Sequence, residues 1–142
     1  MKRKVMLSIV GKQSYHDQEP DVMELVTEGT IEFWNGGWDI SYQESDLTGL
    51  QGVTTTFRVE PDKVTLTRTG SLRSTMEFQI GKTHDSLYQL DFGALMITVT
   101  TRHLFFDIVP EGGCIDLVYD IEIEKSEGGQ VEYHLDIRAI EE

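Results

Sequence analysis

The sequence is short of cysteine and of long apolar runs, and each shortage excludes a class of protein. Among 142 residues there is one cysteine, Cys114, so no internal disulfide can form and a reducing compartment is expected. The N-terminal apolar stretch from Val5 to Val10 contains Ser8 and is too short for a signal-peptide core or a membrane span. We therefore predict a cytoplasmic protein.

Positive charge is also scarce. The 12 lysines and arginines stand against 25 aspartates and glutamates, which gives a formal net charge of -13. Such an acidic surface repels phosphate backbones and anionic lipid headgroups. Lys2, Arg3 and Lys4 form a basic cluster that is too short to reverse this balance. We predict that neither nucleic acid nor a membrane is a partner.

Motifs for metal binding and nucleophilic catalysis are missing. The four histidines are scattered, with no His-x-His or Cys-x-x-Cys spacing. Because no histidine stands at motif spacing from Cys114, we interpret this cysteine as a small, partly buried residue rather than a nucleophile. We predict no metal site and no cofactor. The histidines are His16, His84, His103 and His134.

Glycine, in contrast, is frequent, and it punctuates the chain about every ten residues. Between the turn signals lie β-branched and aromatic runs in which apolar and polar residues alternate, as in antiparallel strands with one buried face. The turn signals are Asn35-Gly36-Gly37, Gly49 to Gly52, Pro61-Asp62, Gly70-Ser71, Gly81-Lys82, Phe92-Gly93, Gly112-Gly113 and Gly128-Gly129.

This pattern predicts an all-β fold, with one domain over residues 1–142. Hairpin-length connections favour a single antiparallel up-and-down β-barrel of about nine or ten strands over a Greek-key sandwich. Helix is expected only as a single turn near Gln18 to Asp21. In the strand from Met23 to Phe33, Gly29 is expected to mark a bulge or a bend. The alternation from Leu72 continues to Ile80.

Two charged residues fall on the interior side of their strands. Every second residue from Trp38 points inward, and this series runs through Ile40 and Tyr42 to Glu44. In the same way, the inward series of Val64 and Leu66 continues to Arg68. Burying either charge alone would cost several kcal/mol, so they should pair or face a wet cavity. Three readings remain open: a structural ion pair that fixes register, an anchor for a small polar ligand, and a parity error caused by a bulge.

Several hydroxyl-bearing residues share this inward parity and favour a cavity over a filled barrel. They are Thr27, Tyr42, Thr55, Ser74, Thr101, Tyr119 and Tyr133. From this set we predict a ligand-binding site formed by Glu44, Arg68, Thr55, Ser74, Tyr42, Tyr119 and Tyr133, with no catalytic residue assigned. The glycine-rich segment Thr48 to Gly52 is a candidate loop at the mouth.

Aromatic residues with outward parity raise the question of an interface. Trp34 points outward beside the Asn35-Gly36-Gly37 turn, and Phe105 has the opposite parity from its neighbours Leu104 and Phe106. For Trp34 the alternatives are cross-strand packing at a hairpin end and an interface hot spot. A monomer and a homodimer both stay open.

Three stretches of the sequence resemble the YwiB-like family. They are Glu44-Ser45-Asp46-Leu47-Thr48-Gly49-Leu50-Gln51-Gly52-Val53-Thr54-Thr55-Thr56, Asp62-Lys63-Val64-Thr65-Leu66-Thr67-Arg68-Thr69-Gly70 and Met76-Glu77-Phe78. The resemblance runs from Gly11-Lys12 to Leu117-Val118-Tyr119-Asp120. These are small bacterial proteins of unknown function that are assigned to the calycin, or lipocalin-like, superfamily. The resemblance implies a calycin-like barrel and no established activity. At Leu90-Asp91-Phe92-Gly93 this chain departs from the Thr-Pro-Tyr/Phe-Gly turn of its relatives.

These observations leave three hypotheses for function. The first is a non-enzymatic module that binds a small amphipathic or anionic ligand at Arg68 and Glu44. The alternative is a structural or protein-interaction barrel without a small ligand, which includes a homodimer. An enzyme that uses Glu44 as acid or base has least support, because no second catalytic group can be identified.

Overall fold

The protein is described by a computed structural model that covers residues 2–15, 18–45 and 50–140. It contains ten β-strands, and every strand pairing is antiparallel. The strands are β1 (Lys2–Ser14), β2 (Asp21–Trp34), β3 (Gly37–Gln43), β4 (Val53–Glu60), β5 (Lys63–Gly70), β6 (Ser74–Phe78), β7 (Thr83–Leu90), β8 (Gly93–Val109), β9 (Gly112–Ile123) and β10 (Ser126–Ala139).

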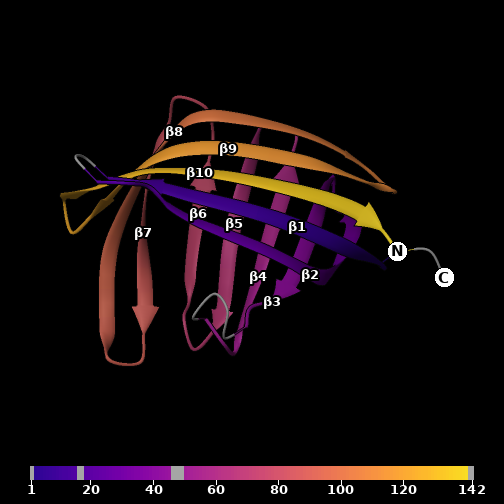
Figure 1. Ribbon diagram of the computed structural model, residues 1–142, viewed down its shortest axis with the longest axis horizontal. Coiled ribbons are helices and arrows are strands. Elements are labelled where there is room, and N and C mark those ends of the chain that lie inside the picture. The colour runs from indigo at the N-terminus through magenta and orange to yellow at the C-terminus, as the bar shows by residue number, and fades with distance from the viewer. Residues whose placement is uncertain (1, 16–17, 46–49, 141–142) are drawn as a thin grey trace.

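The strands form one sheet that curls into a nearly closed barrel, as predicted. Its order is β6-β5-β4-β3-β2-β1-β10-β9-β8-β7, a meander in which β1 pairs with β10. In Figure 1, β1, β2, β9 and β10 cross over the more distant strands β3 to β6. The sheet ends at β6 and at β7, so the barrel has one opening along its wall. We call the line where β6 faces β7 the seam.

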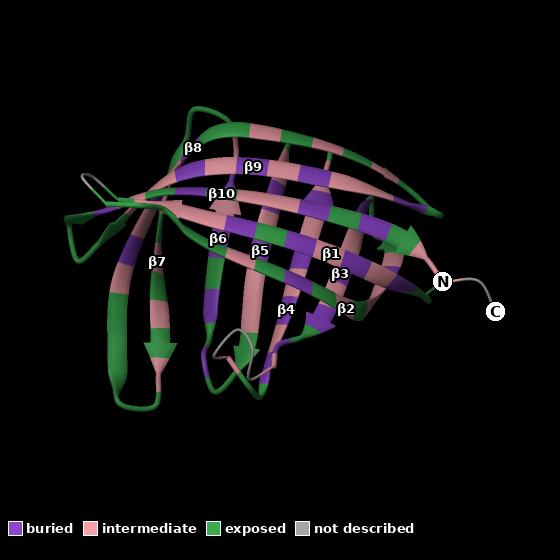
Figure 2. Ribbon diagram, in the orientation of Figure 1, coloured by how far each residue is buried: buried purple, intermediate pink, exposed green. Residues whose placement is uncertain are grey.

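The core lies between the crossing layers and follows the alternation of the sequence. Figure 2 shows buried and more exposed residues alternating along β1, β4 and β10. The largest fully buried side chains come from both layers, and Phe57 and Phe78 lead them. Because one face of almost every strand is buried, a shift in register by one residue would expose a whole row of apolar side chains.

Two of the glycine pairs do not mark turns. The chain reverses at Pro110-Glu111 and at Glu124-Lys125, whereas Gly112-Gly113 begins β9 and Gly128-Gly129 lies inside β10. Glu124 and Lys125 have φ values of 52° and 68°, so they form the tight turn that suits the twist of a hairpin. The register of β10 against β9 shifts between Glu127 and Gln130, where Gly128 and Gly129 lie.

Two further local predictions are wrong. The chain bends at Gln18 and enters β2 at Asp21 instead of forming a helical turn there, because β1 and β2 pair almost to their ends. The alternation that starts at Leu72 also predicts that the strand continues to Ile80. Instead β6 ends at Phe78, and Ile80 lies exposed in the turn that follows. His16 and Asp17 of the first loop lie outside the described residues.

Gly29 is not a bulge. The ladders of β2 with β1 and with β3 pass through it without a register shift, and Gly29 is where pairing with β3 begins. A Cβ at this position would lie 2.5 Å from the carbonyl oxygen of Ser41 and 2.7 Å from a methyl carbon of Leu7. Glycine is therefore required here because β3 and the core approach the backbone closely.

Replacing Gly29 by alanine should lower the free energy of unfolding by about 1–3 kcal/mol, because the backbone oxygen of Ser41 cannot move away cheaply. Gly11→Ala in β1 is the matched control, since a Cβ there meets its nearest atoms, in Met23 and Tyr133, at 3.7 Å. Urea unfolding of both variants measures the difference. An equal effect of the two substitutions would contradict the close-approach explanation.

Candidate functional site

Four of the predicted site residues form one row across the inner wall of the barrel. Tyr42 in β3 lies opposite Thr55 in β4, Thr55 lies opposite Arg68 in β5, and Arg68 lies opposite Ser74 in β6. Tyr42, Thr55 and Ser74 are buried. Side chains directly opposite each other on one face of a sheet are close neighbours. The strand register therefore concentrates polar groups around Arg68.

Glu44 lies at the end of this row. It follows β3, but its backbone N–H still donates to the carbonyl oxygen of Val53 at 2.8 Å, which keeps the inward parity. Its residue exposure is 7%, and its Oε2 accepts a hydrogen bond of 2.6 Å from Thr55 Oγ1. Thr55 thus bonds to Glu44 through its side chain and lies opposite Arg68 in the β4–β5 ladder. The direct Glu44–Arg68 ion pair stays a prediction.

The guanidinium of Arg68 lies among tyrosines that come from both layers of the barrel. Its Nη1 donates to Tyr88 Oη at 3.4 Å. Burial lowers the pKa of Arg68, but the nearby tyrosines, led by Tyr88 and Tyr133, more than offset this and raise it. Burial in turn raises the pKa of Tyr42, Tyr119 and Tyr133. At neutral pH the site therefore combines a cation with uncharged hydroxyl groups.

Arg68 also reaches a groove that opens along the seam. The groove has a volume of about 610 Å³. Inward-facing residues of β5, β6 and β7 contribute Arg68, Ser74, His84 and Ser86, and outward-facing residues form the rim. The complete lining is Thr67, Arg68, Thr69, Arg73, Ser74, Thr75, His84, Asp85, Ser86, Leu87, Gln89 and Met96. We call it the seam groove.

Hydrogen bonding across the seam is sparse. Arg73 and Gln89 exchange two backbone bonds, of 2.9 and 2.8 Å. Farther along, the His84 side chain takes the place of a strand partner: its Nδ1 accepts from the backbone N–H of Glu77 at 3.3 Å, and its Nε2 lies 3.2 Å from Glu77 Oε2. Beyond that, Gly81 bonds to Thr101 of β8. The strands diverge between these points, and the groove occupies the gap.

Three buried polar atoms of the seam groove have no hydrogen-bond partner in the described part of the chain. They are Arg68 Nε, Ser74 Oγ and Ser86 Oγ. The fourth such atom, Tyr42 Oη, belongs to the adjoining row. Leaving a buried polar group unsatisfied costs about 1–3 kcal/mol, so such groups are rare in a purely structural wall. Three of the four such atoms in the described chain lie at this one groove.

The structure divides the predicted site residues. Arg68 and Ser74 line the seam groove, while Tyr119 and Tyr133 belong to the opposite layer, where Tyr119 packs on Phe78 with ring centroids 4.7 Å apart. Thr101 is buried, and Thr27 is only half-buried. The candidate mouth segment from Thr48 lies mostly outside the described residues, which resume at Leu50.

Sequence reasoning missed the contribution of β7. Ser86 and Tyr88 face the interior, and His84 closes the seam. Polar residues occur on both faces of this strand, so the sequence does not show which of its side chains face the interior. A hairpin around the Asp91-Phe92 turn places Tyr88 opposite Leu95, and this pairing could have indicated which face of β7 Tyr88 lies on.

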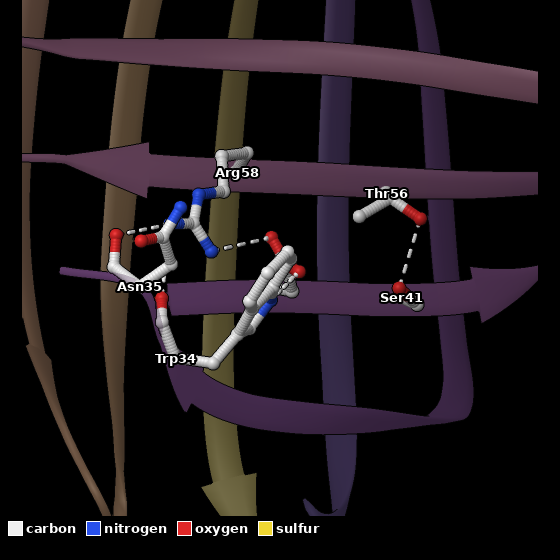
Figure 3. A network of polar contacts seen from close by, with 6 residues as sticks. Trp34, Asn35, Ser41, Thr56 and Arg58 are labelled. Atoms are coloured by element: carbon white, nitrogen blue, oxygen red, sulfur yellow. Dashed lines mark hydrogen bonds and ion pairs between the residues drawn. The ribbon is translucent and has the colours of Figure 1, made fainter. Parts of the chain in front are cut away.

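Trp34 is bound within its own hairpin, which supports its interpretation as hairpin packing. Although 51% exposed, it donates through its indole N–H to Asp39 and carries the Arg58 guanidinium over its ring at 4.9 Å. Arg58 Nη2 donates to the carbonyl oxygens of Trp34 and Asn35, both at 2.9 Å (Figure 3). Ser41 and Thr56 bond beside this network at 2.8 Å. This network fixes the β2–β3 turn to β4.

The outer face of β9 and β10 holds the remaining reactive side chains. Cys114 is half-buried, and burial together with three nearby aspartates raises its pKa, so the thiol stays protonated at neutral pH. His134 Nδ1 bonds to Asp116, and its Nε2 lies 3.0 Å from Asp136 Oδ2. In the described ranges no group of three or more His, Cys, Asp or Glu side chains is arranged to hold a metal ion.

Comparison with known proteins gives a family and a fold. Residues 7–137 match the family model "Domain of unknown function (DUF1934)". The uncharacterized β-barrel protein YwiB of Bacillus subtilis (strain 168) is 25% identical over 124 residues, which cover 87% of this chain and 86% of YwiB. The crystal structure of the ywiB protein from Bacillus subtilis superposes with a TM-score of 0.88 at 21% identity, covering 99% of this chain and 94% of that one. At this identity the structural match supports the fold alone.

Within the part of the chain that is described, no helix is long and apolar enough to cross a membrane.

Removing the unsatisfied hydroxyl group of Ser86 should stabilise the barrel. We expect Ser86→Ala to raise the free energy of unfolding by about 1 kcal/mol, because an orphaned buried oxygen is deleted. Thr55→Val is the contrasting variant: it deletes a hydroxyl that donates to Glu44 and should cost about 1.5–3 kcal/mol. Chemical denaturation measures both. A loss of stability in Ser86→Ala would mean that this hydroxyl has a partner in solution.

The outer-face histidine should make stability depend on pH. Its hydrogen bond to Asp116 leads the causes that raise the pKa of His134 in the folded protein. The charged imidazolium therefore stabilises the fold fully below the unfolded-state pKa of about 6.5, and this contribution is lost as pH rises through the folded-state value. His134→Gln should lower Tm more at pH 5.5 than at pH 9. Equal losses at the two pH values would contradict this assignment.

Proposed function

The chain belongs to the DUF1934 family, and we propose that its barrel is a non-enzymatic module that binds a small amphipathic or anionic molecule in the seam groove. The observation that carries this proposal is the set of unsatisfied buried donors, Arg68 Nε, Ser74 Oγ and Ser86 Oγ, on one groove. A ligand oxygen would supply the acceptor that these groups lack in the described chain.

Arg68 is the proposed anchor. Its guanidinium has a planar arrangement of donors that suits a carboxylate or a phosphate. The tyrosines around it include Tyr119 and Tyr133, whose raised pKa values keep their hydroxyl groups uncharged, so these two groups do not neutralise the guanidinium. Arg73 adds a second positive charge at the rim, where Asp85 is the one carboxylate among the described lining residues, so the arginines outnumber it. In a protein of net charge -13, this local positive charge favours an anion here.

The rim supports the amphipathic part of the proposal. Leu87 and Met96 lie opposite each other on the outer face of the β7–β8 hairpin and line the groove beside the polar floor. A volume of about 610 Å³ lies within the range of about 300–1,000 Å³ for small-molecule sites. We therefore expect a ligand whose anionic end meets Arg68 and whose apolar end contacts Leu87. A cytoplasmic location is part of the proposal, supported by the single cysteine.

The structural alternative is that Arg68 only ties β5 to β7 through Tyr88. In that case its donors would contribute to closing the seam and to nothing else. The two readings differ in whether an anion binds, so a direct binding measurement separates them.

Octanoate and octyl phosphate should each raise the Tm of the protein, and neutral octanol should raise it much less, because it cannot satisfy the guanidinium. Arg68→Gln should weaken calorimetric binding of octyl phosphate at least tenfold. Arg138→Gln is the matched control, since this arginine is exposed on β10 and lies outside the groove.

Leu87→Glu is a second variant that does not depend on the interior, because Leu87 is exposed at the rim. It places a carboxylate beside the anion and should also weaken binding of octyl phosphate. If neither anionic probe binds the natural protein, or if Arg68→Gln binds octyl phosphate as well as Arg138→Gln does, the proposal is wrong.

A further inference from the structure

The second half of β8, residues His103–Val109, is an open strand edge. β7 pairs with β8 only as far as Thr100, and Thr101 bonds to Gly81 and Lys82. The register then shifts between Thr101 and His103, and beyond that point β8 pairs with β9 alone. No backbone hydrogen bond within the described ranges reaches the other side of His103–Val109. We call this segment the β8 edge; it is the outermost strand of its layer in Figure 1.

This edge has few of the features by which natural proteins block strand pairing. Exposed edges usually carry lysine, proline or inward-pointing charges. The β8 edge has none of these: its inner side chains, Leu104, Phe106 and Ile108, pack against the core, and proline occurs only beyond it, at Pro110. Its outer side chains include Phe105, which is 51% exposed. Such an apolar edge with unpaired backbone groups is a template for another strand.

We propose that two copies of this chain associate through the β8 edge, antiparallel and about a two-fold axis at Phe105. Identical strands that pair in this way form an isologous contact, in which each residue meets its counterpart reciprocally. The two barrels then share a continuous sheet across the contact. This association does not depend on the seam groove, which is lined by other residues.

The side chains that would meet across the edge favour a second copy as the occupant and select the register. With Phe105 opposite Phe105 of the second copy, His103 stands opposite Asp107 on the outer face, and the same contact recurs on the other side of the axis. The inner face then pairs Leu104 with Phe106. Centring the axis on Phe106 would instead place Phe105 against Asp107. If the axis passed between two residues instead, each outer side chain would lie opposite an inner side chain of the second copy. The second barrel would then lie on the opposite face of the shared sheet.

An apolar groove below the edge gives the second copy a surface to cover. It has a volume of about 450 Å³, and its apolar walls come from Phe33, Trp38, Val59, Pro61, Phe106 and Ile108. In the proposed register, the inner side chains of the second copy extend the apolar row of β8 above this groove. Backbone pairing and apolar burial would therefore both contribute to the contact.

The mass in solution is the first test. We expect sedimentation equilibrium to give twice 16.2 kDa for the natural chain and 16.2 kDa for Phe105→Glu, which places two carboxylates opposite each other at the axis. Phe92→Glu is the control, because Phe92 is 89% exposed in the β7–β8 turn, away from the edge. A natural chain that stays monomeric, or a dimer that survives Phe105→Glu, would overturn the proposal.

A cysteine experiment tests the register. In a Cys114→Ser background, Phe105→Cys should form a disulfide-linked dimer on mild oxidation, because opposite residues in an antiparallel pair have Cβ atoms about 4.5–5.5 Å apart. Asp107→Cys should not, because the two Asp107 positions are separated by about 13 Å along the strands. Equal cross-linking at the two positions, or none at Phe105→Cys, would also overturn it.

Discussion

The pairing of β1 with β10 is the constraint on which the rest of the structure depends. Every other ladder joins strands that are neighbours in sequence, so each could form as a local hairpin. The ladder from Val5 and Ala139 to Ser14 and Gln130 joins the meander of β1 to β6 to the meander of β7 to β10, and the two then form one ten-stranded sheet that curls into a barrel. The joined sheet encloses the apolar faces of both layers.

Because β1 and β10 pair in the middle of the sheet, the opening of the barrel lies between its two end strands, β6 and β7. A ten-stranded sheet that paired there as well would have no exposed edge. Here β6 has only five residues, and β7 pairs with β8 only as far as Thr100, so two stretches of edge remain. The first becomes the seam groove, and the second is the β8 edge. Both candidate sites thus have one origin, the incomplete pairing of a single sheet.

The polar interior follows the same principle. Arg68 is tolerated inside because β5 lies next to the short β6, which lets the guanidinium reach the seam and Tyr88. Glu44 is tolerated because Thr55 donates to it and because its own N–H continues the ladder to Val53. A barrel closed at this point would have had to bury both charges far from solvent, at much greater cost.

The sequence by itself determined the all-β meander and the buried face of the strands with a clear apolar alternation, because alternation and turn chemistry are local properties. It also indicated that Glu44 and Arg68 face inward. Only the tertiary structure decided what surrounds Arg68, since the tyrosines near it come from strands far apart in sequence, and β7 had no apolar contrast to reveal Ser86 and Tyr88. The turn at Glu124-Lys125 and the close approach at Gly29 were likewise decided by pairing between strands, which no local pattern records.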